Sequence, residues 1–135
     1  MKYTLTRMPP SATELARLYK DAGWLEAPAL EGMQRVLNHP SEWVVGRNGE
    51  GRLLGMGRML TDYARYAFLI DVIVERSYQG EGIGTAIVRA LLAECESIGI
   101  DSVHLWPSKG LVPFYERLGF KALPAEQPHM KWEKI

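Results

Sequence analysis

The segment Gln79-Gly80-Glu81-Gly82-Ile83-Gly84 decides the fold of this chain. It follows an apolar stretch at residues 69–74 that is typical of a buried strand. It opens a helix predicted to end at Ile98, with an apolar stripe at Ile87, Leu91, Cys95 and Ile98. Glycines at a strand-to-helix turn let an anion approach backbone N–H groups at the positive end of the helix dipole. The segment therefore predicts a binding site for a phosphate-like group.

Two common phosphate-binding motifs do not fit this segment. A P-loop requires GxxxxGK[ST], and the chain contains no Gly-Lys pair. The dinucleotide motif requires GxGxxG, whereas the spacing here is GxGxG. Asp101 lies about 20 residues on, but it precedes the next predicted strand instead of closing it. Nucleoside triphosphates and dinucleotides are therefore not the expected ligands.

The rest of the chain predicts a mixed α/β fold, with a central, mostly antiparallel, twisted sheet flanked by about four helices. Ser11 and Glu14 form a capping box at the start of the first helix, and Gly23 ends it. The other predicted helices cover residues 28–37, 83–98 and 111–118, and the predicted strands cover residues 2–7, 42–47, 52–60, 66–74, 102–106 and 129–133. Gly55 and Gly57 share one face of a strand, which predicts either close approach of a backbone or ligand, or a twist or bulge.

Composition narrows the class of protein. The 135 residues show no internal repeat or linker, which predicts a single domain over residues 1–135. Sixteen basic residues balance sixteen acidic ones, so no basic excess is present to attract nucleic acid or an anionic membrane. The longest apolar run, at residues 66–70, is too short for a membrane-spanning helix, and the N-terminus lacks a signal-peptide pattern. A single cysteine, Cys95, and no histidine pair at metal-ligand spacing predict neither a disulfide nor a metal site. We expect a cytoplasmic protein.

A second motif lies downstream, at Phe114-Tyr115-Glu116-Arg117-Leu118-Gly119-Phe120. Together with Gln79-x-x-Gly82-x-Gly84 and the order of elements, it resembles the GNAT superfamily of acetyl-coenzyme A dependent N-acetyltransferases. The resemblance covers residues 2–133 and implies a minimal, single-domain member with a sheet splayed at a bulge. It also implies acetyl-CoA as cosubstrate, with no metal, and direct transfer of the acetyl group to an amine.

The resemblance assigns cofactor contacts to two neighbouring segments. The glycine turn binds the pyrophosphate of coenzyme A through backbone N–H groups, and the preceding strand offers backbone groups to the pantetheine arm and the thioester. The implied contacts are Gln79, Gly80, Glu81, Gly82, Ile83, Gly84 and Thr85 in the turn, and Val72, Ile73 and Val74 in the strand. Ser108 stands where members often carry Asn, and Leu111 where Ala is common; these departures weigh against a cofactor contact at Ser108.

Two residues are candidates for proton transfer. Tyr115 corresponds to the tyrosine that protonates the departing thiolate in many members, and a phenol with a pKa near 10 is still protonated at neutral pH. Its alternative role is packing in the core. Asp71 interrupts an apolar strand, and it is either the base that accepts a proton from the amine or a buried carboxylate paired with a cation such as Arg58. Many members use a water chain instead of a base.

The acceptor is expected to be a small-molecule amine. The resemblance places it beside the loop between the first two helices and the central strands, where the candidate contacts are Trp24, Leu25, Tyr63, Arg65 and Tyr66, with His104 on a later strand. Aromatic side chains and an arginine suit an aromatic or partly anionic amine. The alternatives are a peptide or protein acceptor, or an acyl-CoA binding module without turnover. Sheet edges that need covering also make a homodimer an open possibility.

Overall fold

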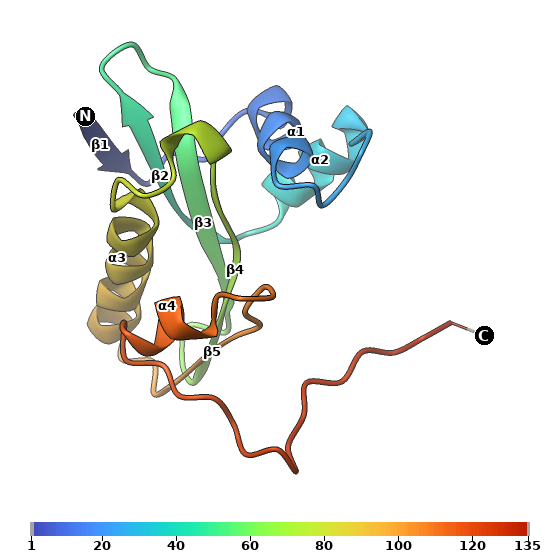
Figure 1. Cartoon of the computed structure of the whole chain (residues 1–135), viewed down its shortest axis with the longest axis vertical. Helices are drawn as coiled ribbons and strands as arrows, with labels where there is room; N and C mark the ends of the chain where they lie inside the picture. Colours follow the sequence, from blue (N-terminus) through green and yellow to red (C-terminus); the bar gives the residue numbers. More distant parts are fainter. Residues whose placement is uncertain (1, 135) are drawn as a thin grey trace. The chain divides into compact units, whose positions relative to one another are not determined.

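The structure, a computed structural model, describes residues 2–134. The chain divides into two compact units, one up to His104 and one from Leu105 onward. The first unit is built on a five-stranded sheet of order β1-β2-β3-β4-β5, whose last strand reaches the boundary (Figure 1). The strands are β1 (Tyr3–Thr6), β2 (Glu42–Asn48), β3 (Leu53–Thr61), β4 (Tyr66–Val74) and β5 (Ser102–Leu105). The first four pair antiparallel, and a helix connects β4 to β5, so the sheet is mixed as predicted.

Three helices cover the two faces of this sheet. Helices α1 (Ala12–Asp21) and α2 (Leu30–Asn38) pack together on one face, and α3 (Ile83–Ile98) lies on the other (Figure 1). The predicted capping box is present: Glu14 N–H donates to Ser11 Oγ (3.1 Å), and Ser11 N–H donates to Glu14 Oε1 (2.9 Å). Helix α2 starts two residues later than predicted, since Ala29, in an extended conformation, precedes it. No helix within residues 2–134 is long and apolar enough to cross a membrane.

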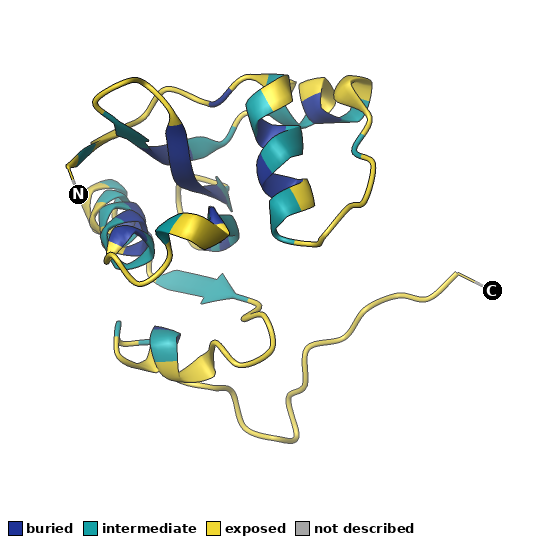
Figure 2. Cartoon of the chain, turned by 45° about the horizontal axis from the view of Figure 1, so that its top comes forward, coloured by how far each residue is buried: buried dark blue, intermediate teal, exposed yellow. Residues whose placement is uncertain are grey.

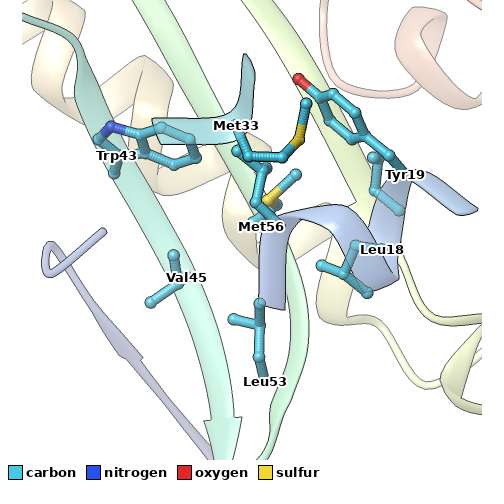
Figure 3. Packing of buried hydrophobic residues seen from close by; sticks show 9 residues of the cluster. Leu18, Tyr19, Met33, Trp43, Val45, Leu53 and Met56 are labelled. Atoms are coloured by element: carbon cyan, nitrogen blue, oxygen red, sulfur yellow. The ribbon is translucent and has the colours of Figure 1, made fainter. Parts of the chain in front are cut away.

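The core consists of apolar side chains on both faces of the sheet. On the α1/α2 face the buried cluster is Leu15, Leu18, Tyr19, Met33, Trp43, Val45, Leu53, Met56 and Ile73 (Figure 3). On the other face, α3 buries the stripe Ile83, Ile87, Val88, Leu91 and Cys95, while its other residues are half-buried or exposed (Figure 2). Cys95 is therefore a core thiol. Burial raises its pKa, so it stays protonated and unreactive at neutral pH.

Gly55 and Gly57 let α3 lie close against the sheet. A Cβ atom at Gly57 would lie 2.9 Å from Ile87 Cγ2 and 3.1 Å from Leu91 Cδ1, and one at Gly55 would lie 3.0 Å from the Ile73 carbonyl oxygen. The first distance is shorter than real Cβ contacts. Both predicted alternatives are present: side chains of α3 and strand β4 approach these glycines closely, and the pairing of β3 with β4 shifts register at Gly57.

Within residues 105–134, the described part of the second unit, the chain forms a short helix, α4 (Val112–Glu116), which is shorter than the predicted 111–118. No strand forms over residues 129–133, so that prediction is wrong. The alternating pattern at Met130 and Trp132 is that of a strand with one buried face, but both side chains are largely exposed (85% and 79%) and no strand in this unit pairs with them. His129 instead stacks on Trp106, with 4.9 Å between ring centroids. Without a partner strand the pattern alone does not produce a ladder.

Candidate active site

The glycine turn has the geometry expected of an anion site. Gly82 precedes α3 in the left-handed conformation (φ +83°) with no side-chain cap, and Gly80 is also left-handed (φ +84°). A Cβ atom added at either glycine would meet nothing within 4 Å, so a ligand can approach the backbone. The N–H of Ala86 donates to the Gly82 carbonyl (3.1 Å), which leaves the N–H groups of Ile83, Gly84 and Thr85 in the uncapped first turn of α3. These groups are the donors that a diphosphate needs.

Hydrogen bonds from neighbouring elements hold the chain that leads into this turn. A short 3-10 helix, η1 (Arg76–Tyr78), separates β4 from the turn. The N–H of Arg76 donates to Asp21 Oδ2 (2.8 Å) at the end of α1, and Gln79 Nε2 donates to the Val74 carbonyl (3.0 Å). The predicted cofactor residue Gln79 therefore folds its side chain back onto the end of β4. In doing so it fixes the path of the turn.

Glu75, directly after β4, is a buried ionic centre that the spacing of residues in the sequence does not indicate. Only 6% of it is exposed, and its carboxylate pairs with Arg17 from α1, with Arg52 at 2.6 Å and with the Ser77 hydroxyl at 2.8 Å. Burial alone raises its pKa, but the bonds from Ser77 and Arg52 and the charges of both arginines outweigh burial and hold the pKa below its usual value. The charged carboxylate thus anchors the start of the glycine turn to α1 and to the residue that precedes β3.

Strand β4 contains the bulge that the resemblance implies. Met56 pairs with Ile73 and Arg58 pairs with Ile70, so Asp71 and Val72 together face the single residue Gly57. Asp71 has φ +54°, in the left-handed region that residues with a side chain rarely adopt. One extra residue of this kind bends a strand and turns the following groups. The predicted contacts at Val72, Ile73 and Val74 lie immediately after this point.

The side chain of Asp71 is held by two donors. Tyr19 Oη donates to Asp71 Oδ2 at 2.6 Å, and Arg58 Nε donates to the same oxygen at 2.8 Å. Arg58 is 9% exposed, and its guanidinium lies over the Trp43 ring at 5.4 Å. The structure therefore contains the predicted Asp71–Arg58 pair, while the role of Asp71 as a base stays a prediction. Tyr19 was missed because sequence separation hides its contact with β4.

Tyr115, the predicted acid, lies in the second unit and is buried. It sits between two aromatic neighbours, with ring centroids 4.9 Å from Phe114 and 5.8 Å from Phe120, both in edge-on geometry. Burial raises the pKa of its phenol above the usual value of 10. The hydroxyl is therefore protonated at neutral pH, the state that an acid requires.

Four of the predicted acceptor contacts fall into two groups. Trp24 is 43% exposed and packs on Tyr19 (centroids 5.7 Å apart), which connects it to Asp71. Tyr66 lies at the other end of β4, five residues or about 16 Å before Asp71. There the Arg65 guanidinium lies over the Tyr66 ring at 5.0 Å, while His104 contacts the Ser102 hydroxyl (2.8 Å) and stacks on Phe68. Of these four residues, Trp24 is connected to the bulge, through the ring of Tyr19.

The sequence matches a known protein family. The Acetyltransferase (GNAT) family profile matches residues 10–120. The chain belongs to this family. The match confirms the predicted resemblance, and the uncapped glycine turn and the bulge lie inside the matched range.

Individual relatives support the same assignment. A Glycine max protein named Histone acetyltransferase TAP1 is 36% identical over 85 residues, which cover 63% of this chain and 37% of that protein. An uncharacterized N-acetyltransferase, ycf52, from Porphyra purpurea is 27% identical over 122 residues, covering 88% of this chain and 70% of its own length. A probable acetyltransferase from Staphylococcus aureus has the same fold, with a TM-score of 0.86 at 22% identity, covering 98% of this chain and 100% of that one. The chain spans about a third of the length of the Glycine max relative.

Proposed function

We propose that this GNAT protein transfers the acetyl group of acetyl-CoA to a primary amine of a small molecule, directly, within a ternary complex. The observation that carries the proposal is the uncapped first turn of α3 behind Gly80 and Gly82, where backbone donors and open space fit a pyrophosphate. Among residues 2–134 no three His, Cys, Asp or Glu side chains are grouped as metal ligands, and the proposed reaction needs none.

The reaction assigns a task to each predicted group. The neutral amine nitrogen attacks the thioester carbonyl carbon, so a C–N bond forms and the C–S bond then breaks. Backbone groups of residues 72–74, after the bulge, are assigned to the thioester oxygen, where negative charge develops. Tyr115 gives its proton to the departing thiolate, and the proton lost by the amine passes through water and restores the phenol. Protons and charge balance over one turnover.

A protein or peptide amine is the second candidate acceptor. The relative from Glycine max is named a histone acetyltransferase, which supports this possibility. A panel of small amines, amino acids, polyamines, peptide N-termini and lysine peptides, assayed for release of the coenzyme A thiol, separates the two. Turnover of small amines supports the proposal, and turnover confined to peptides replaces it with the second candidate. Acetyl-CoA binding without turnover of any acceptor indicates a binding module.

The first experiment measures thermal unfolding with acetyl-CoA, and with ATP and NAD as controls. A ligand at a hundred times its Kd that binds only the folded protein adds about 2.7 kcal/mol of stability, which raises the Tm by several degrees at this chain length. We expect the rise with acetyl-CoA alone. No rise with acetyl-CoA, or a larger one with ATP or NAD, contradicts the assignment of the turn. A homodimer and a cytoplasmic location stay predictions, to be tested by light scattering and by imaging a fluorescent fusion.

A further inference from the structure

Asp71 occupies a backbone conformation that needs support. Glycine adopts the left-handed region without cost, and asparagine and aspartate tolerate it better than other residues. In one common type of bulge this position is a glycine. Here it carries a carboxylate at φ +54°, inside a strand that is otherwise apolar from Ala67 to Val74. The side chain therefore has to contribute enough to offset the strained backbone.

The contacts of Asp71 come from the helix that covers the sheet and from the neighbouring strand. Tyr19 reaches it from α1, and Arg58 reaches it from β3, the strand that pairs with β4 across the bulge. Both donate to the same oxygen, Oδ2, so the direction of the carboxylate is fixed. These are the titratable and charged side chains that hydrogen-bond to it.

Arg58 and Tyr19 are themselves held in place. Arg58 also donates to the Ser41 hydroxyl (3.2 Å) and lies over Trp43, so its guanidinium has little freedom. The ring of Tyr19 belongs to the buried cluster of α1 (Figure 3). Burial and the neighbouring Asp71 charge raise the pKa of its hydroxyl, which keeps it a donor over the whole neutral range. Each donor is thus prearranged before any ligand binds.

We propose that Tyr19 and Arg58 are positioning residues that hold Asp71 in its left-handed conformation, and that Asp71 acts by fixing the bulge and not by accepting the proton of the amine. The bulge in turn sets the direction of the backbone groups of residues 72–74, which follow it. This inference rests on the proposed function, because those backbone groups matter only if they contact acetyl-CoA. The glycine turn, held separately through Glu75 and Asp21, is outside the network.

Three substitutions at Asp71 separate the two roles. Asparagine at position 71 tolerates the left-handed conformation and still offers an oxygen acceptor, so Asp71→Asn keeps both properties. Asp71→Gly tolerates the conformation but has no acceptor, and Asp71→Ala has neither property. A positioning role predicts graded activity, with Asn within ~10-fold of wild-type kcat, Gly lower and Ala lowest. The pH profile of kcat/KM keeps its shape in the Asn variant. If Asp71 is the base, all three variants lose activity to the same extent, and the acidic limb disappears from the profile of the residual activity of the Asn variant; this result overturns the proposal.

Tyr19→Phe tests the network without removing a charge. It deletes one hydroxyl and keeps the buried ring. We expect kcat to fall ~10-fold while the Kd of acetyl-CoA stays nearly constant, because the glycine turn is unchanged. Glu14→Gln is the matched control: it removes a carboxylate charge from the ion pair with Arg47, and glutamine still fits the capping box. A kcat that falls equally in Glu14→Gln, or that does not change in Tyr19→Phe, overturns the proposal.

A structural measurement keeps the inference separate from the proposed function. In backbone NMR spectra, Tyr19→Phe should shift the amide signals of residues 71–74 and leave those of residues 80–85 in place, whereas Glu14→Gln should shift neither set. If the wild type neither binds acetyl-CoA nor releases thiol, the proposed function fails, and these spectra alone decide whether Tyr19 holds the bulge. If the signals of residues 71–74 do not shift, the proposal that Tyr19 holds the bulge is overturned, even if the enzyme is active.

Discussion

Replacing Gly57 with alanine tests the packing of α3 against the sheet. The added Cβ would lie 2.9 Å from Ile87 Cγ2, 3.1 Å from Leu91 Cδ1 and 3.3 Å from Val72 Cγ2. Ile87 is β-branched and lies in a helix, so its χ1 angle is restricted and its methyl group cannot swing away at low cost. The helix or the strand must therefore move. Overpacking of this kind costs about 1–3 kcal/mol, which at this chain length lowers the Tm by roughly 3–10 °C.

The assay is thermal and urea unfolding of Gly57→Ala beside a matched control, Gly49→Ala. Gly49 lies in the turn between β2 and β3, its φ lies outside the left-handed region, and a Cβ there meets nothing within 4 Å. The control variant should be unchanged or more stable by up to about 1 kcal/mol, because alanine reduces the entropy of the unfolded chain. Equal stability of the two variants, or a more stable Gly57→Ala, refutes the close packing of α3 on Gly57.

Three further predictions concern activity and pH. Tyr115→Phe should lower kcat, measured by thiol release, by ~100-fold or more, with little change in the Kd of acetyl-CoA measured by calorimetry. Turnover of this variant at the wild-type rate would remove Tyr115 from the mechanism. Gly84→Val should have the opposite effect, at least ~10-fold weaker acetyl-CoA binding, because a side chain would enter the uncapped turn; unchanged binding by a folded variant would contradict the placement of the turn. Glu14 has a pKa lowered from 4.5 to about 2, chiefly by its hydrogen bond with Arg47, so its stabilisation is complete above pH 4.5 and is lost as the pH falls towards 2. Between pH 4.5 and pH 2, the free energy of unfolding should therefore fall by about 2–3 kcal/mol more in the wild type than in Glu14→Gln. If the two proteins show the same pH dependence, the ion pair is contradicted.

Features that depend on neighbouring residues in the sequence were predictable. The capping box at Ser11 and Glu14 is a local exchange of hydrogen bonds, and the structure contains both of them. The turn at residues 79–84 was predictable for the same reason, because strand, glycines and helix follow one another directly. Strand β4 was predicted with its observed bounds, since its apolar run is long and bounded by polar residues on both sides.

Features that depend on distant residues were not predictable in the same way. The partners of Glu75 lie 58 and 23 residues away, at Arg17 and Arg52, and nothing in the spacing of these residues connects them. The hydroxyl of Tyr19 is likewise 52 residues from Asp71. The strand predicted at residues 129–133 does not form, for a related reason. A strand is stable only when it pairs with another strand, and an alternating sequence does not supply that partner.

The bulge and the glycine turn are held by separate hydrogen bonds, but the same two helices support both of them. Helix α1 holds β4 at both places, through Tyr19 at the bulge and through Arg17 at Glu75. On the opposite face, α3 packs on Gly57, directly across from the bulge, and the first turn of the same helix provides the proposed pyrophosphate donors. A side chain at Gly57 therefore pushes on the strand at the bulge and on the helix that carries the anion site. For this reason Gly57→Ala should weaken acetyl-CoA binding as well as folding, whereas Glu14→Gln, whose ion pair lies outside both contacts, should affect folding alone.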